Sequence, residues 1–552
     1  MKTPFRLLLD LFRARFFEND AVSPEGGFET NIWQVLGFLG TPGFFVTFFL
    51  MPAFMELAVQ KPGPTVDWAV RISRLFFPAY SFAVTGFVTV FEWDMLFPDR
   101  RDFMILASFP LRLRDLFAAK FAALGLFLLT MAGTVNFFPT LMAPAFSMGI
   151  PQVRAAGAVH VIVAQIASTW GASAFAFFAV AAFQGVLINV ASPRIFRRVS
   201  PSIQMFGMSL MVLSLLLFPI YSMLLRPYAH THPQWLWFFP PFWFCGMYDL
   251  LGPRPDALFA SLGWFGMKAL GVAVATFALS WGLGFRRHYR RTLEAEDTSS
   301  RRRPVMRPER LIRSPEQRAI FAFTGWMLER SAKHRLFLAT YLSVGVSFGL
   351  LVTVAIRGGK IGVSQDGLRS LPFLIAFFVI SGFRAAFQFP AELASNWIFR
   401  ITEAEWGETS RSATRKRVLV SGLVPALLVL APVEVWGWGW LPGLLHIVFQ
   451  LAAGALLIEL LFWTFGKVPF TCSYFPGRIN LALLAVLYLY GFTSYSFKMA
   501  DLEQSIDGDA GRAVLFFAAA GAALVGLWLR HPEASAISFD AAEPEIQTLG
   551  LS

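Results

Sequence analysis

The chain has 552 residues, of which 56 % are apolar, 16 % aromatic and only 15 % charged. This composition excludes an ordinary soluble protein, whose surface carries more charged side chains. The formal charge is +12. Because most of this excess lies in a few short segments, we interpret it as a signal of membrane orientation, and we expect no nucleic-acid partner.

Apolar runs of about 20 residues recur along the chain, and a helix of that length crosses a hydrocarbon core of roughly 30 Å. Because backbone amides in lipid must be paired internally, these runs predict transmembrane helices. The predicted fold class is an all-α polytopic membrane protein with about twelve transmembrane helices. The spans are 35–58, 69–92, 117–139, 158–187, 204–225, 259–285, 336–356, 371–389, 418–436, 441–465, 480–498 and 512–529. The prolines inside these runs are expected to kink helices and not to end them: Pro42, Pro52, Pro219, Pro425 and Pro432.

The first residues do not resemble a secretory signal, because Asp10 interrupts a short apolar stretch. One face of a helix over these residues is apolar, formed by Phe5, Leu8, Leu9, Phe12 and Phe16, which predicts a helix in the membrane interface. A helix packed on other protein is the alternative. The predicted organisation is an interfacial helix in 1–30, a six-span half in 31–285, a basic cytoplasmic linker in 286–335, a second six-span half in 336–529 and a disordered cytoplasmic tail in 530–552.

Arginine and lysine placement predicts the orientation. The linker 286–335 holds fourteen basic residues against six acidic ones. The loops with Arg100, Arg101, Arg112 and Arg114, with Arg194, Arg197 and Arg198, and with Arg411, Arg415, Lys416 and Arg417 fall on the same side, whereas "RGGKIGVSQDGLR" is mildly basic on the other. The segment "KMADLEQSIDGDAGR" on the opposite side is net acidic. We therefore expect a multi-pass protein of the cell (inner) membrane with both termini in the cytoplasm. The two cysteines, Cys245 and Cys472, fall on opposite sides, so we expect neither a disulfide nor a metal site.

The two halves resemble each other in the order of their segments. Each begins with a charged amphipathic stretch, and each has a Phe-Pro pair at the cytoplasmic end of its second span, Phe97-Pro98 and Phe389-Pro390. Both halves start on the cytoplasmic side, so the repeat is parallel. Two parallel six-helix repeats are typical of a pseudo-symmetric transporter with its pathway between the halves.

The loop after the second span, "FPDRRDFMILASFPLRLRDLFAAKFAAL" at 97–124, mixes acidic and basic residues. It predicts a short interfacial helix, a turn, and the start of the third span at Pro110. Arginines that only fix orientation are one explanation. They do not explain the acidic residues Asp99, Asp102 and Asp115, or the glutamates of the corresponding loop, so we favour a surface that docks a soluble partner.

The order of segments and this loop resemble the permease subunits of ATP-binding-cassette exporters of the type-2 (ABCG-like) class. The matching residues are Leu106, Ser108, Pro110, Leu111, Leu116, Phe117 and Lys120. In that family this loop is a coupling helix seated on the ATPase. The resemblance therefore implies two ABC-type ATPase subunits as partners. The implied coupling residues are Asp99, Arg100, Arg101, Asp102, Ser108, Pro110, Leu111, Arg112, Asp115, Lys120, Glu403 and Glu405.

The aromatic segment "QWLWFFPPFWFCGMYDLLGPRP" resembles the re-entrant hairpin of the same class, and an aromatic belt at the membrane interface is the alternative. The chain departs from many relatives because both halves are fused and the second half lacks such a hairpin. No Walker A pattern occurs in these 552 residues, since "WTFGKV" and "IRGGKI" lack the first glycine and the hydroxyl residue. We therefore expect no cofactor on this chain, no enzymatic activity of its own, and ATP on a partner subunit.

Polar residues inside spans are candidates for the transport pathway because their burial in a membrane is costly. Hydrogen bonds between helices are the alternative explanation. The candidates are His160, Gln165 and Gln184 on the fourth span and His446, Gln450 and Glu459 on the tenth.

Three functions compete. The first is an ATP-driven exporter that moves a hydrophobic or amphipathic substrate whose identity the sequence does not encode. The second is a twelve-span secondary transporter coupled to protons or sodium, although the glycines of its usual loop pattern are missing around Asp99-Arg100-Arg101. The third is a membrane enzyme acting on lipid-linked substrates, for which the first outside loop offers only Asp67.

Overall fold

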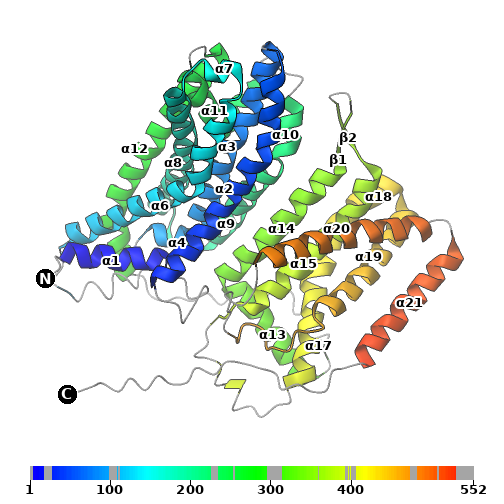
Figure 1. Cartoon of the computed structure of the whole chain (residues 1–552). Coiled ribbons are helices and arrows are strands. Elements are labelled where there is room, and N and C mark those ends of the chain that lie inside the picture. Colours follow the sequence, from blue (N-terminus) through cyan, green and yellow to red (C-terminus); the bar gives the residue numbers. More distant parts are fainter. Residues whose placement is uncertain are drawn as a thin grey trace. The chain divides into compact units, whose positions relative to one another are not determined.

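The structure is a computed structural model of the chain (Figure 1). It describes residues 4–17, 28–61, 63–97, 109, 112–225, 234–252, 255–294, 312, 314–357, 360–391, 396, 398–399, 406–472, 481–506 and 509–529. The chain divides into two compact units, and the division at Ser299 and Ser300 falls inside the basic segment 286–335. Unit 1 holds the elements from α1 to α12, and unit 2 holds those from α13 to α21.

Unit 1 is entirely helical within the described residues. Its main helices are α1 (Pro4–Phe17), α2 (Phe28–Val59), α3 (Pro64–Phe91), α6 (Leu113–Ser147), α8 (Ala158–Val190), α9 (Pro193–Leu216), α10 (Phe218–Leu225), α11 (Pro240–Leu250) and α12 (Ala257–Glu294). The shorter helical elements are α4 (Trp93–Leu96), α7 (Pro151–Arg154) and a 3-10 helix, Gln234–Phe238.

Unit 2 is helical apart from one small hairpin. Its helices are α13 (Pro315–Arg330), α14 (Ala332–Thr353), α15 (Gln365–Gln388), α17 (Trp406–Val418), α18 (Val424–Trp438), α19 (Trp440–Leu461), α20 (Leu481–Ile506) and α21 (Ala510–Leu529). Strands β1 (Val354–Arg357) and β2 (Lys360–Val363) pair antiparallel, with Val354 opposite Val363 and Arg357 opposite Lys360. The predicted span 336–356 therefore ends early, because the β-branched Val354 and Ile356 fit a strand.

Ten of the described helical segments are long and apolar enough to cross a membrane, and they coincide with the first ten predicted spans. The chain is thus an all-α polytopic membrane protein. Helices α20 and α21 occupy the last two predicted positions. The apolar stretch of α21, Gly511–Val525, is shorter than a usual span. The count of twelve therefore stays a prediction.

Of the five prolines named in the sequence analysis, three lie inside helices and two lie at the start of a helix. Pro42 and Pro52 lie inside α2, and Pro432 lies inside α18. Near Pro219, the single residue Leu217 separates α9 from α10. The backbone N–H of Leu217 still donates to the Leu213 carbonyl. Pro425 follows a π-helical turn, Leu419–Leu423, that joins α17 to α18. A proline removes one helix hydrogen bond, and such local turns accommodate the loss.

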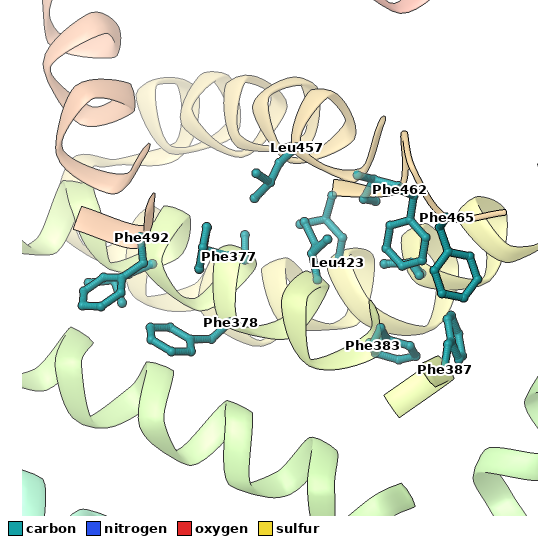
Figure 2. Packing of buried hydrophobic residues seen from close by; sticks show 14 of the residues in the cluster. Phe377, Phe378, Phe383, Phe387, Leu423, Leu457, Phe462, Phe465 and Phe492 are labelled. Atoms are coloured by element: carbon teal, nitrogen blue, oxygen red, sulfur yellow. The ribbon is translucent and has the colours of Figure 1, made fainter. Parts of the chain in front are cut away.

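The second long helix of each unit is its most deeply buried span. In unit 1, α3 packs against α8, α9 and α11; in unit 2, α15 packs against α14, α19 and α20. Figure 2 shows how phenylalanines of α15, among them Phe377, Phe378 and Phe383, meet Leu423, Leu457 and Phe462. Many of the 61 phenylalanines thus form cores, whereas others, such as Phe48 and Phe49 on α2, are exposed.

Helix α1 packs against α6 and does not present its whole apolar face to lipid. Leu8 and Phe12 are buried in the core of unit 1, together with Leu116 and Trp281. Phe5, Leu7 and Leu11 remain exposed. The predicted interfacial face therefore has two parts. Leu8 and Phe12 pack on protein, whereas Phe5 is exposed and can contact the membrane.

Helix α11 is a packed part of the bundle. At 11 residues it is too short to cross a bilayer, and it packs against α12, α8 and α3. Asp249 accepts hydrogen bonds from Nε of Arg71 on α3, at 3.2 Å, and from the backbone N–H of Asp256, at 2.8 Å. Phe242 and Phe244 are fully buried, which favours a re-entrant segment over a belt of aromatics at the membrane interface.

Two glycines let α11 and α12 approach closely. A Cβ on Gly246 would lie 2.3 Å from the carbonyl oxygen of Phe259, and a Cβ on Gly263 would lie 2.7 Å from the carbonyl oxygen of Gly246. Both distances are shorter than real Cβ contacts, so each position requires glycine.

Replacement of Gly246 by alanine is expected to destabilise unit 1 by about 1–3 kcal/mol, the usual cost of overpacking. Gly271 on α12 is the matched control, because a Cβ there meets nothing within 4 Å. Thermal unfolding of the purified protein measures both variants. Equal melting temperatures for Gly246→Ala and Gly271→Ala would contradict the close approach of the two helices.

Candidate functional site

Most of the predicted coupling residues lie outside the described part of the chain. These are Asp99, Arg100, Arg101, Asp102, Ser108, Pro110, Leu111, Glu403 and Glu405. The three that the structure describes lie at the start of α6. Arg112 is exposed at the helix N-cap, Asp115 is half-buried in the first turn, and Lys120 is buried. The carboxylate of Asp115 suits the positive end of the helix dipole.

Lys120 joins α6 to α1. Its side chain is 1 % exposed, and its ammonium nitrogen lies 4.8 Å from the ring centroid of Phe12, which is itself fully buried. A desolvated cation over an aromatic face contributes on the order of 2 kcal/mol. Lys120 therefore acts inside the protein, where it fixes α1 to the start of the third span. We call this contact joint 1.

A second joint has the same plan in unit 2. Helix α13 packs against α17, and Arg417 of α17 is 8 % exposed beneath it. The guanidinium lies 3.9 Å from the ring centroid of Phe321 and donates to the Phe321 carbonyl at 2.6 Å. A Cβ on Gly325 would lie 1.6 Å from the guanidinium, so this glycine leaves the space that Arg417 occupies. We call this contact joint 2.

The start of α13 is capped by its own sequence. Ser314 accepts a hydrogen bond from the backbone N–H of Gln317, and its hydroxyl donates to Glu316. The hydrogen bond from Ser314 lowers the pKa of the Glu316 carboxyl, and a negative charge in the first turn stabilises a helix. Helix α13 therefore has local signals for folding before it docks on α17.

Arg415 and Glu459 form an ion pair between α17 and α19, with Nη1 and Oε2 2.6 Å apart. The sequence placed Glu459 among the pathway candidates and Arg415 among the orientation charges. The structure pairs them, and their side chains are only 13 % and 19 % exposed. A buried pair of this kind is costly to break, because removal of one partner leaves the other charge uncompensated.

The pathway candidates of unit 1 lie apart from one another. His160 is exposed in the first turn of α8. Gln165 donates from Nε2 to the Pro139 carbonyl at 3.5 Å, and Gln184 donates to the Trp93 carbonyl at 2.8 Å. These contacts are hydrogen bonds between helices, the alternative explanation for such residues.

The candidates of unit 2, in contrast, come together with two further acids. Gln450 donates from Nε2 to Oε1 of Glu434 at 3.0 Å, and Nδ1 of His446 contacts Oε1 of Glu503. Glu434 lies near the end of α18 but is only 2 % exposed within unit 2. Glu503 was not a candidate, because it belongs to a segment that reads as an acidic outside loop.

Metal binding finds no support in the described residues, which contain no group of three or more His, Cys, Asp or Glu side chains arranged to hold a metal ion.

Replacement of Arg417 by methionine is expected to loosen α13, because the cation over Phe321 and the hydrogen bond to its carbonyl are both lost. The expected cost is about 2 kcal/mol, the usual value for hydrogen bonds to a buried charged group. Lys416→Met is the control, because Lys416 is exposed and bonds only Gln317 of α13, at 2.7 Å. Hydrogen–deuterium exchange over Pro315–Arg330 should rise in Arg417→Met and not in Lys416→Met; equal exchange would contradict the role of joint 2.

Comparison with protein-family models, with curated proteins and with solved structures gives no match for this chain.

Proposed function

We propose that this chain is the transmembrane permease of an ATP-driven exporter and that two separate ABC-type ATPase subunits hydrolyse the ATP. The observation that carries the proposal is the pair of joints. In each unit a helix that precedes the first span is fixed, through a buried cation and a phenylalanine ring, to the start of the third span. That start directly follows the loop at which the coupling residues are expected.

A parallel repeat of the two units supports the same proposal. Helix α1 packs on α6 as α13 packs on α17, and the second span is the central helix in both units. The third span of each unit begins with a buried cation, Lys120 or Arg417. Two equivalent joints suit a permease that receives two ATPase subunits, one on each unit.

The joints offer a mechanical route for coupling. A partner that moves the loop 97–112 also moves the first turns of α6, and the contact between Lys120 and Phe12 carries that movement to α1. In unit 2 the same movement acts on α17, where Arg417 holds α13 and Arg415 holds α19 through Glu459. Ion pairs and rigid helices are the elements through which such coupling travels.

The two units differ at their last spans. Unit 1 places the packed helix α11 before α12. In unit 2, α20 and α21 follow each other closely, and Asp509 accepts from the backbone N–H of Arg512 at 3.1 Å. We infer that the two halves contribute unequally to a substrate pathway. We further propose the inner membrane as the location, with both termini in the cytoplasm, because the basic segments fall on that side.

A separate observation supports a second candidate function. Glu434, His446 and Glu503 are ionisable groups buried within one membrane unit, which is typical of transporters driven by protons. A secondary transporter with twelve spans is therefore the alternative.

A pull-down of the tagged protein from its own cells, with mass spectrometry of the bound proteins, tests the proposal. We expect an ATPase at about two copies per chain, which is lost when Asp99, Arg100, Arg101 and Asp102 are all replaced by alanine. The control replaces Lys498 and Asp501, two exposed charges of α20, and should retain the ATPase.

Two results would count against the proposal. If no ATPase co-purifies and transport in vesicles follows an imposed proton or sodium gradient, the secondary transporter replaces the exporter. If the ATPase binds the four-alanine variant as well as the parent, the permease stands but the loop 97–112 is not its docking site.

A further inference from the structure

Four polar side chains of unit 2 are buried together at the ends of three helices. They are Glu434 of α18, His446 and Gln450 of α19, and Glu503 of α20, with exposed fractions of 2 %, 6 %, 1 % and 7 %. We call them the Glu434 cluster. Helices α18 and α19 pack against each other, and α20 packs against α19.

Two contacts organise the cluster. The Gln450 carboxamide donates to Oε1 of Glu434, and the His446 imidazole contacts Glu503. The rings of Trp438 and Phe373 pack against the imidazole, with centroid distances of 4.7 and 6.0 Å. These rings occupy the space beside His446, so the cluster is a compact polar core and not a cage for an organic cation.

Within the described part of unit 2, Glu434 and Gln450 each bury an oxygen without a hydrogen-bond partner. The atoms are Oε2 of Glu434 and Oε1 of Gln450. Two acceptors cannot bond each other, and a buried polar atom without a partner costs about 1–3 kcal/mol. A proton on Glu434 changes this balance, because a carboxylic acid can donate one hydrogen bond to a carboxamide oxygen while it accepts another from the carboxamide nitrogen.

The charges within the cluster also favour a proton on Glu434. His446 contacts Glu503, whereas Glu434 remains a buried acid with one hydrogen bond among the described residues, the neutral one from Gln450. Glu434 lies close enough to His446 and Glu503 for their charges to act on it. An uncompensated carboxylate in a protein interior costs far more than a neutral carboxylic acid.

None of the other described charged side chains on the surrounding helices makes a hydrogen bond or an ion pair with Glu434. Those groups are Lys333, His334 and Arg335 on α14, Asp366, Arg369 and Arg384 on α15, Arg411, Arg415, Lys416 and Arg417 on α17, Glu459 on α19, Lys498 and Asp501 on α20, and Asp509 and Arg512 at α21. The described residues also hold no set of ligands for a metal ion. A proton fits the cluster, because it needs only the two oxygens that lack hydrogen-bond partners among the described residues.

We propose that Glu434 is a proton-binding site, in which one proton on Oε2 completes a paired carboxylic acid and carboxamide with Gln450 beside the His446–Glu503 pair. The proton comes from water, one O–H bond forms, and no group is oxidised or reduced. The inference rests on the contacts of unit 2 alone and does not depend on whether ATP drives transport.

Unit 1 shows that buried polar groups in this chain need not titrate. Ser81, Thr85, Asn136 and Ser173 form a buried network across α3, α6 and α8, with Asn136 donating to Ser173 at 3.0 Å and Thr85 donating to Ser173 at 3.0 Å. Every member is neutral at all physiological pH values. The Glu434 cluster differs from this network because three of its four members are ionisable.

Infrared spectroscopy of the purified protein in lipid nanodiscs tests the proposal, because a protonated carboxyl group has its own carbonyl band that shifts in heavy water. We expect this band at neutral pH in the parent protein and its loss in Glu434→Gln. The control is Glu56→Gln, since Glu56 is an exposed glutamate of α2, and this variant should keep the band.

Three results would overturn the assignment. They are a parent protein without the band above about pH 5, where ordinary carboxyl groups have ionised, a band that survives Glu434→Gln unchanged, and a band lost only in Glu503→Gln. The pH titration of the parent protein needs no variant, so it decides the matter even if a variant fails to fold. Gln450→Leu adds a check, because loss of the carboxamide should shift the band without removing it.

Discussion

A buried cation held against a phenylalanine ring fixes the first helix of each unit to its third span. Such a cation is stable only where the ring and backbone carbonyls replace the water that it has lost. At joint 2 the ring and the carbonyl both belong to Phe321, and Gly325 supplies the room. At joint 1 the ring of Phe12 is fully buried beside Lys120. The position of α1 and α13, and the mechanical route that we propose, depend on these two contacts.

The two units bury polar side chains of different kinds. In unit 1, neutral serine, threonine and asparagine side chains form a hydrogen-bonded network that includes two residues of α3. Unit 2 buries three ionisable groups and one carboxamide at the ends of α18, α19 and α20. A pseudo-symmetric protein that keeps its architecture but changes the chemistry of one half can assign different tasks to its halves. We propose that both halves receive mechanical input and that the Glu434 cluster of unit 2 binds a proton.

The sequence predicted the helices well, because runs of about 20 apolar residues have no other stable structure in lipid. Periodicity also predicted which face of α1 is apolar, but it could not say what opposes that face. Leu8 and Phe12 therefore turned out to pack on α6. Arg415 and Arg417 were counted as orientation charges, because composition does not distinguish a buried arginine from an exposed one.

The polar cluster of unit 2 was predicted in part. His446 and Gln450 were candidates because they are polar residues within a predicted span, and both are buried on α19. Glu434 and Glu503 are 69 residues apart in the sequence and on different helices, and only tertiary packing brings them near that face. A signal was present in principle, since both glutamates lie within or beside apolar runs where an unpaired charge is costly.

We propose that this chain receives separate ATPase subunits at the ends of its two units where the joints lie. Electron cryomicroscopy of the complex purified from native membranes can show where such subunits bind. We expect two ATPase subunits, seated against residues 97–112 and 392–405, next to α6 and α17. A chain that purifies without an ATPase, or one whose partner covers the opposite ends of these helices, would contradict it.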